Sequence, residues 1–513
     1  MSDQYRRAAP LFRTDILLAL LMGVSALALY IRTLAPSLLW GDSAEFQTLS
    51  YTLGMTHPSG YMTQIILGKL FTYIPAGNIA YRVNLMSAFF GALTVAQVYL
   101  IVRMLGGMAV AGISAAMMLA LAELFWWRAL IAESYAPAAG MTATIWLLFL
   151  FWQRTQRPAY LFLAGLAGGL SVGIHSTVLM TSVPVLVTMA IATRKRADWI
   201  RAAAGALLGM ALTFSFFLFL DQRDPPSSIY NTVYRPALSA IGLTMSEFDT
   251  PLERFLAIFP AGHFWSYYFT AGAQETGRRL AEYLSFHPVW AVFLILLGIF
   301  ASFRRSWRAG LYPLLGFLLV WGFAVTVAFS VYQEFYVPAA IFVYVWFGLG
   351  ASIILEQIFQ WKHAGLRALF IAVSIFFLAL PLWHARRDLD PAIRNGYTTF
   401  VRRDHIYPIF APDKAIRDAT RVTSRVEDNA IVFSDWDKLY SYIYTAHIEE
   451  GRTGIAFHEA TISDDPSLAQ STLDYIDGNI DARPIYFTIL MPELAERYQV
   501  EQIHETLYRI HRK

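Results

Sequence analysis

The sequence predicts a mainly α-helical, polytopic membrane protein that carries a small α/β domain after its last span. Three observations lead to this fold class. Hydrophobic residues make up 56% of the 513 residues, above the ~45–50% of a soluble domain. Uncharged apolar stretches recur through the first three quarters of the chain, each near the ~20 residues that a helix needs to cross a bilayer. The last quarter is charged and divided by turns instead.

Composition excludes several kinds of function. The net charge of +3 is too small to favour nucleic-acid binding. The chain has no cysteine, so it forms no disulfide and no thiolate metal site. It contains neither a P-loop nor a G-x-G-x-x-G motif, the usual signs of a bound nucleotide. We therefore assign no metal ligand and no cofactor from the sequence, and metal dependence stays open.

About eleven apolar stretches are predicted to span the membrane. The predicted spans are 14–34, 81–104, 108–126, 136–153, 159–175, 177–193, 200–220, 287–303, 310–330, 337–356 and 366–384.

Basic residues predict the orientation, because short loops rich in Lys and Arg stay in the cytoplasm. A cytoplasmic N-terminus places nearly all basic loops on that side, Arg128 being the exception. An odd number of spans then places the C-terminus outside. We expect a membrane domain over 1–384 and an extracytoplasmic domain over 385–513. The loops 35–80 and 221–286 face the same side as that domain.

The segment after the last span reads as alternating strands and helices. Short apolar runs occur at 430–435, 454–459 and 483–490, and a helical pattern fills 438–450. Strands that alternate with helices favour a small α/β layer.

The first external loop holds the strongest candidates for chemistry. Asp42 and Glu45 are three residues apart, so both carboxylates lie on one face at the start of a predicted helix, 45–53. The simpler interpretation is a capping box, with Asp42 at the N-cap and Glu45 at N3. Ionisable groups at a membrane face usually mark function, and we therefore predict that both residues are catalytic.

Further candidates lie close by. His57 precedes Pro58, which is either a turn feature or a substrate contact. Arg82 and Asn84 begin the second span. Arg82 either anchors the helix at the headgroups or binds a phosphate, and we predict the phosphate role.

Four more candidates are predicted on the external face. Arg128 and Glu133 share a short loop, and either form an ordinary ion pair at headgroup level or bind substrate. His175 ends a span and either bonds to backbone or contacts substrate. Arg223 begins the long external loop and is a further cation for a phosphate.

The motifs together resemble the protein O-mannosyltransferase-like membrane family of the GT-C superfamily. The resemblance runs in order along most of the chain. It is carried by GDSAEF (41–46), HPSGY (57–61), YRVNLMSAFFGALT (81–94), WWRALIAESYA (126–136), GLSVGIHSTVL (169–179) and FLFLDQRDPP (217–226).

The resemblance implies a GT-C fold and an enzyme of the bacterial inner membrane. Such enzymes move a sugar, mannose in this family, from a polyprenyl-phosphate carrier to an acceptor hydroxyl on the outer face, with inversion. The essential acid maps onto Asp42, with Glu45 as its neighbour. The classical members carry an adjacent Asp-Glu, whereas this chain has Asp-x-x-Glu. The implied partners are the bilayer, the lipid-linked sugar and an acceptor protein or glycan.

Three alternatives stay open at this point. The acceptor is a serine or threonine of a protein, or instead a lipid or glycan. A transporter or flippase of the lipid carrier is a different class, although the spans lack the paired, interrupted halves typical of transporters. A non-catalytic scaffold that binds partners through its tail is the third.

Overall fold

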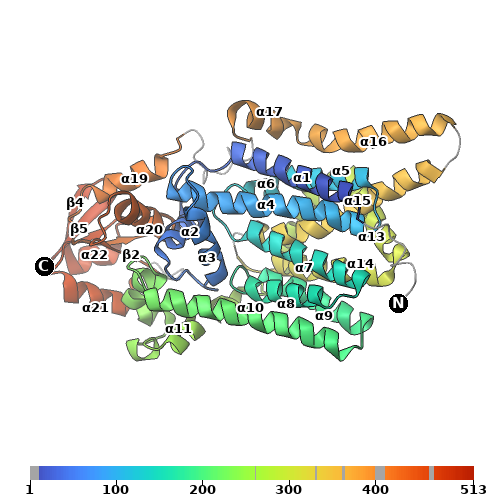
Figure 1. Cartoon of the computed structure of the whole chain (residues 1–513). Coiled ribbons are helices and arrows are strands. Elements are labelled where there is room, and N and C mark those ends of the chain that lie inside the picture. Colours follow the sequence, from blue (N-terminus) through green and yellow to red (C-terminus); the bar gives the residue numbers. More distant parts are fainter. Residues whose placement is uncertain (1–10, 260–261, 330–331, 361–363, 399–410, 462–466) are drawn as a thin grey trace. The chain divides into compact units, whose positions relative to one another are not determined.

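The computed structural model describes residues 11–259, 262–329, 332–360, 364–398, 411–461 and 467–513 (Figure 1). The chain forms two compact units, each discontinuous in sequence. The first unit comprises Met1–Leu34, Ser87–Thr213 and Phe264–Arg403. The second comprises Ala35–Met86, Phe214–His263 and Asp404–Lys513. The sequence-based boundary at 384/385 refers to the membrane and stays a prediction.

The first unit is helical. Two of its helices, α4 and α10, are shared with the second unit. The helices are α1 (Arg13–Arg32), α4 (Ile79–Met104), α5 (Ala109–Ala120), α6 (Glu123–Arg128), α7 (Tyr135–Thr155), α8 (Ala159–Ser171), α9 (Thr177–Ala192), α10 (Arg196–Arg223), α12 (Ala273–Ser285), α13 (Val289–Arg305), α14 (Trp307–Thr326), η6 (Gln333–Phe335), α15 (Tyr336–Gln360), α16 (Ala364–His384) and α17 (Arg386–Asn395).

The chain is a multi-pass membrane protein with fewer long spans than predicted. In the described part of the chain, seven helices are long and apolar enough to cross a bilayer, or eight if α12 and α13, bent by 98°, count as one span. Each of the eleven predicted stretches is helical, but α5, α8 and α9 have only 12, 13 and 16 residues. By length and composition, the described helices thus give seven or eight candidate spans against the eleven stretches predicted, because these three helices are shorter than 18 residues.

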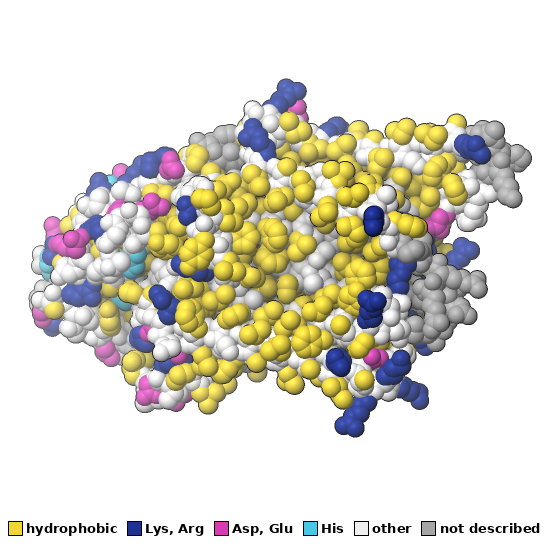
Figure 2. Space-filling view, in the orientation of Figure 1, with side chains coloured by type: hydrophobic (Ala, Val, Ile, Leu, Met, Phe, Trp, Pro, Cys, Tyr) yellow, Lys and Arg dark blue, Asp and Glu magenta, His cyan; other side chains and the backbone are white. Residues whose placement is uncertain are grey.

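The exposed side chains of the spanning helices are apolar, as expected for a surface in contact with lipid. On α1, Leu17, Leu20 and Val24 are 65%, 58% and 63% exposed. Figure 2 shows such hydrophobic side chains covering most of the visible helical surface. Such apolar surface is stable in contact with lipid hydrocarbon and unfavourable in contact with water.

The second unit joins the first external loop to the C-terminal domain. Its helices in the loop regions are α2 (Gly41–Thr52), α3 (Met62–Thr72), η2 (Tyr230–Tyr234), η3 (Arg235–Ile241), η4 (Met245–Glu247) and α11 (Pro251–Ile258). The 3₁₀ helix η5 (Gly262–Tyr267) leads back to the first unit. The predicted helix at 45–53 thus begins four residues earlier than expected.

A five-stranded mixed sheet forms the C-terminal part of the second unit. Its strands are β1 (Ile431–Ser434), β2 (Ala456–Glu459), β3 (Ile485–Phe487), β4 (Tyr498–His504) and β5 (Leu507–Arg512), in the order β2-β1-β3-β5-β4. Strand β1 runs parallel to both β2 and β3, and β5 is antiparallel to β3 and β4. Helices α19 (Lys414–Thr423), α20 (Trp436–Ile443), η7 (Tyr444–Glu449), α21 (Gln470–Asn479) and α22 (Pro492–Arg497) accompany it. The α/β prediction is confirmed, and the three predicted strands correspond to β1, β2 and β3.

Candidate active site

Asp42 lies in the first turn of α2, one residue after the helix begins. The N-cap is Trp40, and Gly41 has a φ of 57°, a left-handed conformation that glycine adopts without strain. Asp42 is thus at the second helical position and Glu45 at the fifth. The capping-box interpretation is therefore wrong, because neither carboxylate occupies a capping position.

The carboxylate of Asp42 is held by the C-terminal domain. The indole Nε1 of Trp436 donates a hydrogen bond to Asp42 Oδ1 at 2.8 Å. Trp436 is the first residue of α20, whose N-cap Asp435 accepts a hydrogen bond from the Lys438 backbone N–H at 3.1 Å. This cap fixes the start of the helix, and with it the indole. Asp42 is partly exposed, and a carboxylate has further lone pairs for a substrate hydroxyl.

Glu45 is fully buried and bound at both oxygens by one residue. Its Oε1 accepts the His57 backbone N–H at 2.7 Å, and its Oε2 lies 2.5 Å from His57 Nδ1. Burial raises the pKa of Glu45, and the nearby His57 opposes that shift. The His57 ring packs near Tyr61 and Trp436, with ring centroids 5.0 and 5.7 Å apart. Glu45 and His57 therefore form one unit that lies against the indole holding Asp42.

Two more carboxyl groups come from the edge of the sheet. Burial, together with the carboxylates of Asp435 and Glu45, raises the pKa of Glu459 to about 8. Burial and the neighbouring carboxylates of Asp435 and Asp42 raise the pKa of Asp437. At neutral pH Glu459 is therefore mostly protonated and can donate a hydrogen bond. In the described ranges, no group of three or more His, Asp or Glu side chains is arranged to hold a metal ion.

Arg82 and Asn84 both donate hydrogen bonds to backbone carbonyls. The Arg82 guanidinium donates to the carbonyl oxygens of Thr72, Ala76 and Gly77 at 2.9, 3.0 and 3.1 Å. Asn84 is buried, donates to Ala35 O at 3.0 Å and accepts from the Gln47 side chain at 2.8 Å. Both residues fix the loop that carries α2 and α3.

A different pair of cations lies together in the second unit. Lys69, on α3, donates to Tyr51 O at 2.7 Å, and its ammonium is 4.5 Å from the centre of the Tyr51 ring. Burial and the positive charge of Arg223 both lower the pKa of Lys69. Arg223 is exposed in the last turn of α10. A nearby like charge disfavours the charged form of Lys69, and a bound anion would offset that repulsion.

The remaining predicted residues form a cluster in the first unit. Arg128 hydrogen-bonds Glu334, and its Nη1 lies 3.9 Å from Glu133 Oε1. The three side chains are only 6%, 11% and 11% exposed, so this is not an exposed headgroup-level pair. The buried His175 is within 2.8 Å of Thr177 Oγ1, and its ring lies 5.0 Å from that of Tyr135. Tyr135 also lies 5.9 Å from the Arg128 guanidinium, which links His175 to the ion pairs.

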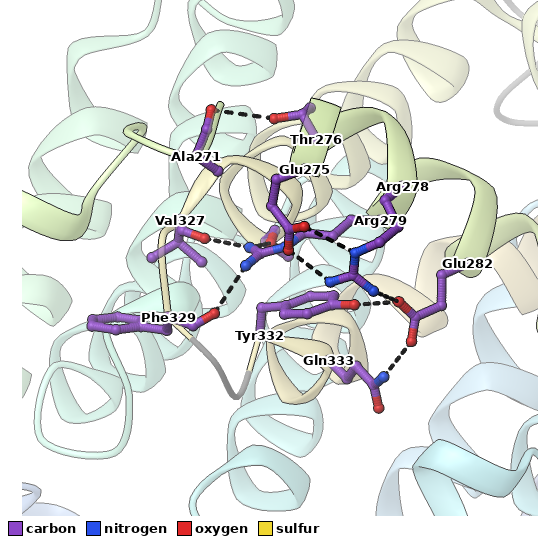
Figure 3. Close-up of polar contacts among 11 residues, drawn as sticks. Ala271, Glu275, Thr276, Arg278, Arg279, Glu282, Val327, Phe329, Tyr332 and Gln333 are labelled. Atoms are coloured by element: carbon purple, nitrogen blue, oxygen red, sulfur yellow. Dashed lines mark hydrogen bonds and ion pairs between the residues drawn. The ribbon is translucent and has the colours of Figure 1, made fainter. Parts of the chain in front are cut away.

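Helix α12 holds the segment that presents Glu334. Figure 3 shows Arg279 and Glu282 of α12 pointing toward the chain that leads into η6. Arg279 is buried and donates to backbone carbonyls, while Glu282 accepts from side chains. The contacted residues are Val327, Phe329, Tyr332 and Gln333. Glu334 follows directly, so α12 positions it beside Arg128.

The sequence relates part of this chain to a known family. Residues 42–199 match the family described as "Protein O-mannosyl-transferase TMEM260 N-terminal domain". This match confirms the predicted resemblance over these residues. The mouse protein O-mannosyl-transferase TMEM260 is 37% identical over 113 residues, which is 22% of this chain and 16% of the mouse protein. The Dictyostelium discoideum protein of the same name is 24% identical over 147 residues, 28% of this chain and 18% of its own. The matches thus span less than a fifth of these relatives.

Solved structures confirm the GT-C fold over nearly the whole chain. ArnT from Cupriavidus metallidurans bound to undecaprenyl phosphate has a TM-score of 0.56 at 13% identity, covering 96% of this chain and 97% of ArnT. The Archaeoglobus fulgidus oligosaccharyltransferase tethered with an acceptor peptide has a TM-score of 0.51 at 14% identity, covering 92% and 68%. At such identities the likeness concerns the fold alone.

Sequence reasoning missed Trp436, Asp437, Glu459 and Glu334. A usable signal existed for the first three. They lie at the carboxyl ends of the adjacent parallel strands β1 and β2, the edge where α/β sheets usually bind ligands. Glu334 carries no comparable signal, because its pairing with Arg128 joins residues 206 positions apart.

Proposed function

We propose that this protein is an inverting glycosyltransferase that moves a sugar from a polyprenyl-phosphate carrier to an acceptor hydroxyl. The observation that carries the proposal is the partly exposed Asp42 carboxylate, oriented by Trp436 beside the buried Glu45–His57 pair. The matched family supports mannose as the sugar and a protein serine or threonine as the acceptor. ArnT with its undecaprenyl phosphate supports a lipid carrier.

Asp42 acts as the general base in this proposal. The acceptor hydroxyl is a weak nucleophile until a base within hydrogen-bond reach accepts its proton. The acceptor oxygen bonds to the anomeric carbon as the bond from that carbon to the phosphate oxygen breaks. The proton goes to Asp42, and the carrier leaves as polyprenyl phosphate. Glu45 is a positioning residue, because both of its oxygens already bind His57.

Lys69 and Arg223 are our candidates for the departing phosphate. Charge develops there in the transition state, and nearby cations stabilise it. Lys69 donates to one backbone carbonyl, Tyr51 O, whereas the Arg82 guanidinium donates to three. We therefore assign Arg82 and Asn84 to support of the loop, and the phosphate contact to Arg223 with Lys69.

The Arg128 cluster suits a neutral, hydroxyl-rich ligand. One guanidinium faces two carboxylates, so its charge is already compensated. Carboxylates accept hydrogen bonds from hydroxyl groups, and His175 lies beside them through Tyr135. We propose that Glu133, Glu334 and His175 form a binding site for hydroxyl groups within the first unit.

We also propose that the second unit lies outside the cytoplasm. The basic loops favour that orientation, and carriers of this kind deliver sugar at the outer face in the resembling family. Protease added to spheroplasts should cleave the C-terminal domain, whereas inside-out vesicles should protect it. Cleavage in the inside-out vesicles alone would reverse the assignment.

The function is tested with the purified protein in nanodiscs. It is incubated with mannosyl, glucosyl or arabinosyl polyprenyl phosphates and with Ser/Thr peptides, and products are identified by mass spectrometry. We expect a hexose on the peptide hydroxyl with the mannosyl donor. Sugar found on an added lipid or glycan instead would identify that molecule, and not a protein, as the acceptor. Translocation of the carrier without any transfer would support the flippase alternative.

A further inference from the structure

Helices α8, α9 and α10 of the first unit border an apolar groove of about 230 Å³. Ser182 is the one hydroxyl among the residues that line it, and it donates to Val178 O at 3.1 Å. The groove therefore offers little to a polar ligand and suits a hydrocarbon chain. Lining residues include Leu161, Gly168, Leu186, Met189, Trp199 and Met210.

The groove cannot close by bringing α8 and α10 nearer. A Cβ at Gly165 would overlap Ala202 O, and one at Gly205 would overlap Phe162 O, so the two backbones already touch. Gly168 differs, because a Cβ there would meet only Ser182 Oγ, at 3.7 Å. The space beside Gly168 is thus a fixed feature of the helix packing, and an unfilled apolar space forfeits dispersion contacts.

One end of the groove lies beside a cluster of cations. The glycine contacts pair Gly165 with Ala202 and Gly169 with Ala206, so α8 and α10 run parallel and begin at the same end. Met189 and Trp199 line that end. Four exposed cations surround the turn from α9 to α10: Arg194, Lys195, Arg196 and Arg201. Figure 2 shows Lys and Arg side chains gathered where α10 begins.

The basic turn has an ordered backbone. Thr193 donates to Asp198 Oδ2 at 2.7 Å and accepts the Lys195 backbone N–H at 3.1 Å. Asp198 is buried. With four cations and this one carboxylate, the turn carries a net charge of about +3. Basic pockets between spanning helices bind anionic lipid headgroups.

We propose that α8, α9 and α10 bind an anionic phospholipid, with its phosphate at the basic turn and one acyl chain in the groove. This site differs from the proposed donor site. Arg196 and Arg223 are at opposite ends of the 28-residue α10, roughly 40 Å apart at ~1.5 Å per residue. One phosphate cannot contact both.

Native mass spectrometry of the full chain, released from nanodiscs of cardiolipin, phosphatidylglycerol and phosphatidylcholine, tests the proposal. We expect retained anionic lipid on the wild type and about 30-fold weaker retention in Arg194→Gln/Arg196→Gln, since each cation contributes about fivefold. Arg304→Gln/Arg367→Gln, which removes two exposed cations elsewhere, should retain the lipid. Gly168→Leu should fill the groove and lose it, whereas Gly322→Leu, into open space on α14, should not.

Two results would overturn the proposal. Equal retention in the wild type and in both Arg194→Gln/Arg196→Gln and Gly168→Leu would mean nonspecific annular lipid. Added undecaprenyl phosphate that displaces the phospholipid, and is itself lost in Gly168→Leu, would identify the groove as a carrier site. Neither readout depends on glycosyl transfer, so failure here leaves the proposed function standing.

Discussion

Replacing Trp436 with phenylalanine removes the hydrogen bond to Asp42 and keeps an aromatic ring. The indole donates to Asp42 Oδ1 at 2.8 Å and packs against His57 and Tyr440, with ring centroids 5.7 and 5.5 Å apart. A phenyl ring preserves most of that packing. A hydrogen bond to a charged group contributes roughly 1.5–3 kcal/mol, and each ~1.36 kcal/mol is a tenfold change in rate. If Asp42 is the base, kcat should fall about 10- to 150-fold in Trp436→Phe.

The assay is peptide mannosylation under varied donor and acceptor concentrations. Loss of orientation should lower kcat with little change in either KM, whereas partial unfolding should lower only the active fraction. Trp152→Phe is the matched control, because the Trp152 indole is buried and its Nε1 has no partner among the described residues. Its kcat should stay at the wild-type value even if the melting temperature falls. A Trp436→Phe kcat within twofold of the wild type would refute the role of Trp436.

Three further predictions concern the neighbours of Asp42. Glu45→Gln should lower kcat about tenfold, less than loss of the base, because Glu45 orients His57 through two contacts; a total loss of transfer would instead make Glu45 the base. The pKa of Glu459 is raised to about 8, so its contribution to stability is full below its ordinary pKa and disappears as pH rises through 8. Glu459→Gln should therefore melt ~2–4 °C above the wild type at pH 9, with a smaller difference at pH 6, and identical pH dependence of the two proteins would contradict the raised pKa. Arg223→Gln should raise the donor KM about tenfold, whereas Arg82→Lys should lower thermal stability with little change in donor KM. The opposite effects of the two substitutions would assign the phosphate contact to Arg82.

Local sequence patterns predicted the helical membrane fold and the first external loop, which carries the candidate catalytic residues. Apolar runs located each spanning helix, because the bilayer imposes length and composition on any segment that crosses it. Alternating strands and helices located β1, β2 and β3. The ionisable residues of the first loop marked the place where the second unit gathers its carboxylates.

Other features depend on contacts that no local pattern contains. The capping-box interpretation failed because Gly41 starts the helix early, which turns Asp42 toward a residue 394 positions later. Arg82 suggested a phosphate site in sequence, yet its guanidinium meets three carbonyls of the preceding loop. The predicted spans outnumber the candidate spans of the structure because α5, α8 and α9 are apolar but short.

The most direct test of the account is single-turnover transfer by Asp42→Asn in nanodiscs. Asparagine keeps the size of the side chain and can still accept the Trp436 hydrogen bond, but it cannot take the acceptor proton. We predict a rate about 10²–10⁴-fold below the wild type, with unchanged melting temperature and unchanged donor binding. A rate within a few-fold of the wild type would contradict the assignment of Asp42 as the base.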